Sequence, residues 1–403
     1  MTTLPLGPVA VPSPPSAFPG RRCRVGFDAT SLLDPPTGVG TFSREVLAGL
    51  AGRPDLDVTA FAVSLRGRGR LPDLVPAGVR PSRRAIPARL ARAAWLRGDH
   101  PTVRVLAGPI DVVHGPNFVV PPGGAAAEVV TVHDLTALHH PGLCTPDVLQ
   151  WPPLLRRALR RGAWVHTVSG FVADEVRTAF PEAVDRVVAI PNGHTVPDPP
   201  TPRSDAARGR HLAGAGRYVL AVGTVEPRKD LPLLVAAFDR LAGADPDLGL
   251  VIAGPDGWGA AALTEAIDRA RHRRRVRRLG WVDDDTRWAL VRGASVVAYP
   301  SRYEGFGLVP LDAMAVRTPV VATSAGAVPE VVDDAARLVP VGDVDAFTDA
   351  LGAVLGDDAV AAALVAAGTA RVARFRWDHT VDGLAELYGR AVAARVRCSA
   401  RGR

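Results

Sequence analysis

Short apolar segments alternate with longer amphipathic segments along the whole chain. In the first half, we expect strands at Cys23–Phe27, Val58–Val63, Asp111–His114, Val129–His133, Trp164–Val168 and Val187–Ile190, and helices at Thr41–Ala51, Pro146–Arg161 and Gly170–Ala179. In the second half, we expect strands at Tyr218–Val222, Leu250–Ala253, Val276–Leu279, Val296–Tyr299 and Val320–Ala322, and helices at 231–242, 261–272, 284–293 and 308–316. Strands that alternate with helices predict an α/β protein with doubly wound parallel sheets.

One break interrupts this alternation, at Val196–Arg210, where Pro occupies positions 197, 199, 200 and 202. Proline removes a backbone donor and interrupts regular elements, so we predict a linker there. The predicted organisation is a disordered Pro-rich tail at 1–20, an N-terminal acceptor-side Rossmann-like domain at 21–195, a linker at 196–215, a C-terminal Rossmann-like domain at 216–378, and a helix at 379–397 that packs back on the N-terminal domain. Two such domains are expected to face a cleft that holds a ligand at the carboxyl ends of the strands.

Composition narrows the functional classes. Hydrophobic residues make up 47% and charged residues 22% of the 403 positions, which is ordinary for a globular protein. The three Cys residues are too few and too scattered for a disulfide framework or a zinc site, so we expect a reducing, cytoplasmic location. No segment approaches the ~20 apolar residues of a membrane span. The net charge of +7 predicts an anionic partner, which would be a nucleic acid, an anionic lipid or a phosphorylated substrate.

The chain contains a single lysine, Lys229, among its 48 Lys and Arg residues. Where nearly every cation is Arg, one Lys suggests a site that needs a compact point charge in place of a planar fork. Lys229 lies in the segment Gly223–Asp230 (GTVEPRKD), after an expected strand and before an expected helix. A cation pair at that place is suited to holding an anionic ligand, and chance placement of the one lysine is the alternative.

A second segment with candidate chemistry is Tyr299–Ala315 (YPSRYEGFGLVPLDAMA), which follows one expected strand and opens one expected helix. Gly305 and Gly307 allow a tight turn whose amides, together with the helix N-terminus, form a nest for phosphate. Glu304 and Asp312 carry acceptor-only carboxylates, which suit the hydroxyls of two sugar rings. Gly-x-Gly alone is equally typical of a structural loop, whereas two acids eight residues apart around it are a more specific pattern.

Residues 299–331 and 221–238 closely resemble the retaining glycosyltransferases of the GT-B fold, family 4. The family pattern places Glu, seven residues and Glu around Gly-Phe-Gly-Leu. Further landmarks of the family are Gly38–Gly40, Thr131–Leu135 (TVHDL), Pro191–Gly193 (PNG), Pro319–Ala322 (PVVA) and Phe375–Trp377, so the resemblance covers about 22–396. Within the family, the chain is most similar to the branch that includes many mannosyltransferases using GDP-mannose.

The resemblance implies a role for each matching residue. Arg228 and Lys229 would hold the donor diphosphate, and Glu304 would bind hydroxyls of the donor sugar. His133 would lie across the cleft, near the reacting centre. The other donor-binding positions would be Gly38, Gly40, Gly223, Glu226, Gly305, Phe306, Gly307, Leu308 and Asp312, with Asp312 on the ribose.

Two positions depart from the family pattern. Asp312 replaces the second Glu and is one methylene shorter, so it would reach the ribose hydroxyls from a closer helix or through a bridging water. Asp230 replaces Asn beside the proposed phosphate site, and we expect its carboxylate to cap the following helix and turn away from the ligand. Ser169 is expected to cap the helix that begins near Phe171.

The predicted reaction needs neither a metal nor a cofactor. The sequence offers no clustered His/Asp ligand set, so cations and helix N-termini would stabilise the leaving diphosphate. The resemblance implies front-face attack with retention, in which the departing phosphate oxygen takes the acceptor proton. The predicted function is transfer of a hexose, with mannose from GDP-mannose favoured, to a saccharide or lipid-linked acceptor in cell-envelope or polysaccharide synthesis.

Other interpretations stay open. The donor would then be a UDP- or ADP-linked sugar, or the chain would be a sugar-nucleotide epimerase that shares the two-domain fold. A dinucleotide-dependent oxidoreductase is disfavoured because no Gly-x-Gly-x-x-Gly follows the first strand of either half. A basic α/β nucleic-acid-binding protein would explain the Arg-rich runs. That interpretation is opposed by an aromatic content of 5% and by the lack of a recognised binding motif, so no nucleic-acid partner is expected.

The Arg-rich runs also suggest a peripheral site on the inner face of the plasma membrane. Residues 66–97 hold nine Arg and one acid. We expect Arg89 and Arg92 on one helical face, and Leu90, Ala94 and Trp95 on the other. Residues 154–161 gather Arg156, Arg157, Arg160 and Arg161. A basic amphipathic surface of this kind suits anionic lipid, and a solvated face in an Arg-biased protein is the alternative.

Overall fold

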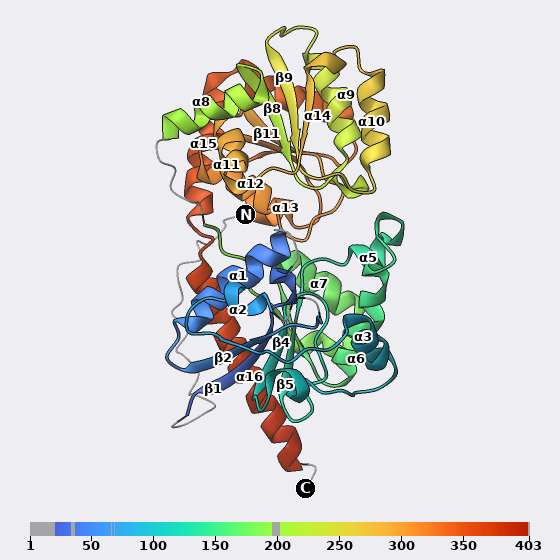
Figure 1. Cartoon of the computed structure of the whole chain (residues 1–403). Helices are drawn as coiled ribbons and strands as arrows, with labels where there is room; N and C mark the ends of the chain where they lie inside the picture. Colours follow the sequence, from blue (N-terminus) through green and yellow to red (C-terminus); the bar gives the residue numbers. More distant parts are fainter. Residues whose placement is uncertain (1–20, 34–36, 66, 68, 196–201, 402–403) are drawn as a thin grey trace, which may run out of the picture. The chain divides into compact units, whose positions relative to one another are not determined.

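The computed structural model describes residues 21–33, 37–65, 67, 69–195 and 202–401 (Figure 1). The predicted tail at 1–20 and the first part of the predicted linker, 196–201, lie outside these residues. Contacts between Cα atoms divide the chain into two compact units. The first unit contains the described residues up to Val130 together with Arg157–His166 and the segment from Thr380 onwards, and the second unit contains Thr131–Arg156 and Thr167–His379.

One sheet has seven strands in the order β3-β2-β1-β4-β5-β6-β7. These strands are β1 (Cys23–Asp28), β2 (Leu56–Phe61), β3 (Arg80–Pro81), β4 (Val112–Gly115), β5 (Ala127–Val132), β6 (Trp164–Thr167) and β7 (Val187–Ala189). The pairs β1–β2, β1–β4, β2–β3 and β4–β5 are all parallel. Parallel strands are buried on both faces, which agrees with β4 and β5, in which every residue is buried.

Helices connect and cover these strands. They are α1 (Gly38–Ala51), α2 (Leu71–Leu74), α3 (Ala88–Arg97), α4 (Arg104–Ala107), α5 (Thr136–His139), α6 (Trp151–Arg160) and α7 (Gly170–Ala179), with short 3-10 turns η1 (Thr30–Leu32), η2 (Pro141–Leu143), η3 (Val148–Gln150) and η4 (Pro181–Arg186). Helix α1 buries Phe42, Val46 and Leu50, whose spacing of four residues places them on one face. Ser169 caps α7 by accepting a hydrogen bond from the Val172 amide, which confirms that prediction.

The other sheet has six strands in the order β10-β9-β8-β11-β12-β13. They are β8 (Arg217–Val222), β9 (Leu248–Ala253), β10 (Val276–Gly280), β11 (Val296–Tyr299), β12 (Val320–Thr323) and β13 (Arg337–Val339). The helices are α8 (Pro202–Ala213), α9 (Leu231–Leu241), α10 (Ala260–Arg269), α11 (Asp284–Gly293), α12 (Leu308–Ala315), α13 (Val328–Val332), α14 (Val344–Gly356), α15 (Asp358–Val372) and α16 (Trp377–Arg401), with 3-10 turns η5 (Pro227–Lys229) and η6 (Arg273–Arg275). This strand order reverses between β8 and β11, and α/β proteins bind ligands at such a switch point.

Alternating side chains of the six-stranded sheet pack into two separate cores. Val219 of β8 belongs to one core, together with Phe238 of α9 and Phe347 of α14. Leu220, the next residue along the strand, belongs to the other core, together with Leu311 of α12. Successive side chains of a strand point to opposite faces, so helices must cover both faces (Figure 1). Two parallel sheets of Rossmann type therefore confirm the predicted fold class.

Helix α8 occupies most of the predicted linker, which is the main difference between the predicted and observed elements. The helix begins at Pro202, a residue that a helix tolerates in its first turn. Its Gly209 packs so closely on α11 that a Cβ there would lie 2.0 Å from the Ala289 carbonyl oxygen. Of the four prolines that indicated the linker, Pro202 opens this helix, and the role of the segment as a linker stays a prediction. Helices α14 and α15 and the short strands β3 and β13 were not assigned from the sequence either.

The expectation that Leu90 and Trp95 lie on the same face of the helix at 88–97 is wrong. Trp95 is buried, and its indole nitrogen donates to the Pro101 carbonyl at 2.9 Å. Leu90 is 68% exposed instead. Five helical residues turn through about 500°, so Leu90 and Trp95 cannot share one face. In the second Arg-rich run, at 154–161, Arg161 forms an ion pair with the buried carboxylate of Glu128 at 2.8 Å, so its charge balances a buried charge within the fold.

The final helix, α16, extends the predicted 379–397 segment at both ends. Its Val381 contacts α1 so closely that a Cβ on Gly49 would lie 2.3 Å from the Val381 side chain. The hydroxyl of Tyr388 lies 2.7 Å from Nδ1 of the buried His114. Among the described helices, no single one is long and apolar enough to cross a bilayer. The segments Val344–Gly356 and Asp358–Cys398 reach that length and apolar composition only when taken together, and they are bent by 97° relative to each other.

Candidate functional site

The predicted cation and carboxylate segments meet at the switch point of the six-stranded sheet. Strand β8 is followed by Gly223 and then by η5, which carries Arg228 and Lys229. Strand β11, the neighbour of β8, is followed by the loop that carries Glu304. The two loops therefore emerge from the carboxyl ends of adjacent parallel strands, where a ligand site is expected.

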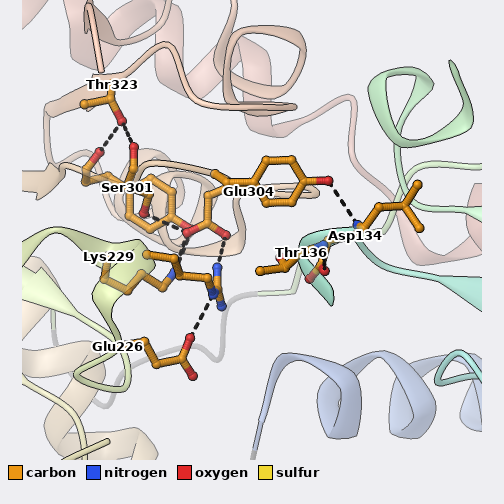
Figure 2. A network of polar contacts seen from close by, with 11 residues as sticks. Asp134, Thr136, Glu226, Lys229, Ser301, Glu304 and Thr323 are labelled. Atoms are coloured by element: carbon orange, nitrogen blue, oxygen red, sulfur yellow. Dashed lines mark hydrogen bonds and ion pairs between the residues drawn. The ribbon is translucent and has the colours of Figure 1, made fainter. Parts of the chain in front are cut away.

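Glu304 is the centre of an ion cluster (Figure 2). Its Oε1 accepts from Nζ of Lys229 at 2.5 Å and from Oγ of Ser301 at 2.7 Å. Its Oε2 accepts from Nη1 of Arg228 at 2.8 Å, and Nε of Arg228 donates to Glu226 at 2.8 Å. Both cations and both carboxylates are largely shielded from water, and only 8% of the Glu304 side chain is exposed. The structure thus brings together four residues that were predicted to act on the donor.

Burial and charge pairing set the protonation states of the cluster. Burial alone would raise the pKa of Glu304, but Arg228 and Lys229 outweigh it and lower that pKa from 4.5 to about 2. Burial disfavours the charged form of Arg228, yet Glu304 and Glu226 raise its pKa above the usual value. Burial lowers the pKa of Lys229, Glu304 opposes that shift, and Arg228 adds to it. Glu304 is therefore an acceptor at neutral pH, while Lys229 is the group whose charge is sensitive to its surroundings.

The ammonium of Lys229 lies in a confined space. It is 4.6 Å from the centroid of the Tyr299 ring and 3.1 Å from the Tyr299 hydroxyl oxygen. A cavity of about 10 Å³ beside it is lined by Gly223, Lys229, Tyr299 and Ser301, among others. That volume is about enough for one water molecule and too small for a larger cationic head group.

Two glycines allow the Glu304 loop to pack against its neighbours. Gly326 has a φ of 56°, and a Cβ there would lie 2.2 Å from the Glu304 carbonyl oxygen. The same carbonyl accepts from the Ala327 amide at 2.8 Å. Gly305 leaves so little room that a Cβ would lie 1.7 Å from the His133 carbonyl oxygen, while its own carbonyl accepts from Ser169 at 2.8 Å. Main-chain contacts therefore fix the position of Glu304.

The expected cap at Asp230 is wrong. Asp230 adopts a left-handed conformation with a φ of 45°, and its side chain makes no capping hydrogen bond to α9. Its carboxylate instead accepts from Nε of Arg302 at 2.8 Å. Asp tolerates the left-handed region because its short polar side chain bonds locally, and the exposed Arg302 balances its charge.

Asp312 lies one turn into α12 and has partners of its own. Its Oδ1 lies 2.8 Å from Nε2 of His194, and its Oδ2 accepts from Arg287. The guanidinium of Arg287 lies over the Trp288 ring, 4.4 Å from its centroid. The carboxylate that is one methylene shorter than Glu is thus held from two sides. Its predicted role on the ribose stays a prediction.

The other predicted residues lie in varied surroundings. Gly307, with a φ of 133°, precedes the first residue of α12, Leu308, so its amide lies at a helix N-terminus. Phe306 is buried and packs edge-on against Phe375 at 5.7 Å between ring centroids.

Gly38 and Gly40 lie in the first turn of α1, in the first unit, where the Gly40 amide donates to the Thr37 hydroxyl. The roles of these residues and of His133 in donor binding stay predictions.

Sequence reasoning missed several residues that build the site. Tyr299 looked like the last core residue of a strand, and Ser301 like a loop residue. Tyr303 was also missed, although its hydroxyl accepts from the Leu135 amide at 3.0 Å and donates to Glu175. His194 directly follows the Pro191–Gly193 landmark, which was the one available signal. Within the described part of the chain, no group of three or more His, Cys, Asp or Glu residues is arranged to hold a metal ion.

Two protein families match the chain. "Glycosyl transferases group 1" matches residues 205–371, and "Glycosyl transferase 4-like domain" matches residues 37–193. The O-antigen chain mannosyltransferase B of Escherichia coli is 32% identical over 302 residues, which cover 74% of this chain and 77% of that protein. The phosphatidyl-myo-inositol mannosyltransferase of Mycolicibacterium smegmatis is 35% identical over 221 residues, which cover 53% of this chain and 55% of that protein.

Solved structures share the fold at low sequence identity. Sucrose-phosphate synthase from Thermosynechococcus elongatus superposes with a TM-score of 0.70 at 20% identity, over 93% of this chain and 100% of that one. The Anabaena protein HepE in complex with UDP and glucose superposes with a TM-score of 0.67 at 21% identity, over 91% of this chain and 99% of that one. At these identities the likeness establishes the architecture of two Rossmann-like sheets.

Replacing Gly326 with Ala should destabilise the protein. The new Cβ would collide with the Glu304 carbonyl in a conformation that non-glycine residues rarely adopt, so we expect a loss of about 2–4 kcal/mol. Urea unfolding would measure it. The matched control is Gly356→Ala at the end of α14, where a Cβ would meet nothing within 4 Å and the effect should be near zero or stabilising. Equal stabilities of the two variants would contradict the proposed packing.

The charge of Glu304 should make stability depend on acid pH. Its folded pKa of about 2 lies below the ordinary 4.5, so its contribution is fully present above pH 4.5 and is lost as the pH falls towards 2. Glu304→Gln should therefore cost on the order of 3 kcal/mol at pH 7 and almost nothing near pH 2. Unfolding curves from pH 7 to 2 would test this convergence. Glu265→Gln, which breaks an exposed pair on α10, should cost less than about 1 kcal/mol throughout.

Proposed function

This chain belongs to the group 1 glycosyltransferases and has their GT-B fold, and from that premise we propose that it is a retaining enzyme that transfers mannose from GDP-mannose. The observation that carries the proposal is the ion cluster of Arg228, Lys229 and Glu304 at the switch point. It combines cations suited to a diphosphate with a fixed acceptor suited to sugar hydroxyls.

The two cations are placed to bind the donor diphosphate. An ammonium has three donors, and Lys229 uses two of them on Tyr299 and Glu304, which leaves one for a phosphate oxygen. The N-terminus of α12, where Gly307 provides no side-chain cap, contributes main-chain amides and the positive end of the helix dipole. Together these groups would neutralise the charge that develops on the leaving nucleoside diphosphate.

Glu304 is suited to bind the transferred sugar. Its pKa of about 2 keeps it ionised at neutral pH, so it accepts hydrogen bonds and does not donate them. Ser301, Lys229 and Arg228 fix both of its oxygens. A carboxylate held in this way selects a sugar by where its hydroxyls lie, because a misplaced hydroxyl leaves a buried polar group unpaired.

We propose front-face substitution without a covalent intermediate. The bond from the anomeric carbon to the diphosphate oxygen breaks, and the acceptor oxygen bonds to that carbon on the same face. The diphosphate leaves with the electron pair of the broken bond, and its departing oxygen takes the proton of the acceptor hydroxyl. Arg228 and Lys229 stabilise that oxygen electrostatically, and neither is consumed.

The donor and acceptor assignments rest on the relatives. Two mannosyltransferases, one for an O-antigen chain and one for phosphatidyl-myo-inositol, support mannose and a saccharide or lipid-linked acceptor. The UDP and glucose complex of a structural relative supports a UDP-linked donor as the second candidate. A lipid-linked acceptor would place the enzyme at the cytoplasmic face of a membrane, where Arg89 and the exposed Leu90 of α3 would meet anionic lipid.

A donor screen tests the proposed chemistry directly. Thermal unfolding would be followed with GDP-mannose, UDP-glucose and ADP-glucose, and with duplex DNA as the nucleic-acid control. Selective stabilisation by GDP-mannose at 100 times its Kd should contribute about 2.7 kcal/mol to folding. Stabilisation by a UDP- or ADP-sugar would correct the donor, and stabilisation by DNA alone would refute the enzyme assignment.

Loss of either charge in the cluster should strongly reduce transfer without unfolding the chain. Lys229→Ala and Glu304→Ala are each expected to lower kcat by about 10²–10³-fold, because each removes a group that acts on the transition state. Arg273→Ala serves as the control, because it removes an exposed cation on η6, outside the site. Near-normal turnover in both cluster variants would refute the assignment.

Lys229→Arg should also lose transfer, even though it keeps the positive charge. The guanidinium is larger than the ammonium, and its planar fork would pair with the Glu304 carboxylate, so it would leave no donor directed at a phosphate oxygen. We expect kcat/KM to fall by about one to two orders of magnitude, which corresponds to about 1.4–2.7 kcal/mol of transition-state stabilisation. An unchanged rate would mean that charge alone suffices.

A further inference from the structure

Tyr299 is the last residue of β11, and its side chain ends beside the only lysine of the chain. The Lys229 ammonium donates to the Tyr299 hydroxyl at 3.1 Å and lies 4.6 Å from the centre of its ring. Tyr299 is only 4% exposed, so both contacts are shielded from water. A cation held at once by a hydroxyl and by a ring face has little freedom to move.

We propose that Tyr299 is a positioning residue that holds the Lys229 ammonium in its charged form and aims it at the donor diphosphate. The proposal rests on the proposed function, and it adds a residue that acts on substrate through Lys229. No motif in the sequence marks Tyr299 for this task, because a tyrosine at the end of a buried strand is ordinary.

Several titratable groups surround the Lys229 ammonium. The titratable groups that face its ammonium are Glu304 from the loop after β11, Arg228 from η5, Glu226 from the loop after β8, and Tyr299 itself. Glu304 attracts the ammonium and Arg228 repels it, so these charges alone would draw Lys229 onto Glu304. Tyr299 provides a second partner that stays neutral, because burial foremost and the charge of Glu304 next raise its pKa well above 10.

The main chain and the ring of Tyr299 are both held in place. Thr323 on the adjacent strand β12 donates to the carbonyls of Tyr299, at 3.4 Å, and of Ser301, and Ser301 in turn donates to Glu304 (Figure 2). The ring packs in the core with Leu220 and Leu311. A rigid partner reduces the entropy that Lys229 would lose on binding a ligand.

The space beside the Lys229 ammonium is also confined. The cavity of about 10 Å³ lined by Gly223, Lys229 and Tyr299 has room for about one water molecule, so the space beside the ammonium is small. Without the Tyr299 hydroxyl, the ammonium would lose one hydrogen bond to its charged form. Its pKa would then fall, and Glu304 would be left as its hydrogen-bond partner beside the ring.

The single lysine allows a direct measurement. Uniformly ¹³C-labelled lysine incorporated into the full-length protein gives one side-chain Cε signal, whose titration reports the pKa of Lys229. Tyr299→Phe keeps the ring and removes only the hydroxyl, so we expect the Lys229 pKa to fall by about one unit. The high-pH limb of kcat/KM should move to lower pH by the same amount, and kcat/KM at neutral pH should drop about tenfold.

Tyr218→Phe is the matched control. Tyr218 is a fully buried tyrosine of the neighbouring strand β8, and its hydroxyl donates to the Leu290 carbonyl at 2.6 Å, away from Lys229. Its loss costs a buried hydrogen bond of similar kind and should leave the Lys229 titration and the shape of the pH profile unchanged. A structural effect of Tyr299→Phe would look like this control.

The outcomes separate the two hypotheses. If GDP-mannose is transferred and Tyr299→Phe titrates and turns over like Tyr218→Phe, the positioning role is refuted and the proposed function stands. If Tyr299→Phe shifts the Lys229 pKa but GDP, UDP and ADP all leave the Lys229 signal of the wild-type protein unmoved, the donor role of Lys229 and the proposed function are refuted together. A pKa shift accompanied by a nucleotide-dependent signal supports both.

Discussion

The buried carboxylate of Glu304, held between Arg228 and Lys229, is the interaction on which the candidate site depends. Removing one carboxylate and two cations from water costs several kcal/mol per ion, and only close, well-oriented pairing offsets this cost. Burial of each of the three side chains therefore depends on the other two being held in place. This explains why Ser301, Glu226 and Tyr299 supply further hydrogen bonds around the cluster.

Backbone geometry makes this pairing available. Adjacent parallel strands β8 and β11 end at the same edge of the sheet, so the loops that follow them are neighbours without any long excursion. The close approach of Gly326 to the Glu304 carbonyl and of Gly305 to the His133 carbonyl sets the height of the loop. Any side chain at those positions would push Glu304 away from its cations. Glycine is required here for space as well as for conformation.

The sequence revealed the members of the cluster but not the way they are held. The apolar runs predicted the buried strands well, since parallel strands are buried on both faces and carry a strong signal. Arg228, Lys229 and Glu304 were found from local motifs. Tyr299 and His194 were not, because their importance lies in contacts with Lys229 and Asp312, which are 70 and 118 residues away. Asp230 was misread for the same reason, since its partner Arg302 comes from another loop.

Charge balance gives the lone lysine its meaning. Arg228 and Lys229 contribute two positive charges and Glu226 and Glu304 two negative ones, so the cluster is formally neutral. Net charge therefore cannot attract a diphosphate to it, and the direction of the free donors must do so. An arginine at 229 would present its planar fork to Glu304 and be satisfied there. An ammonium bonded to Glu304 and to a neutral tyrosine keeps one donor pointing elsewhere, which is the physical reason why a chain that uses arginine almost everywhere retains a lysine at this position.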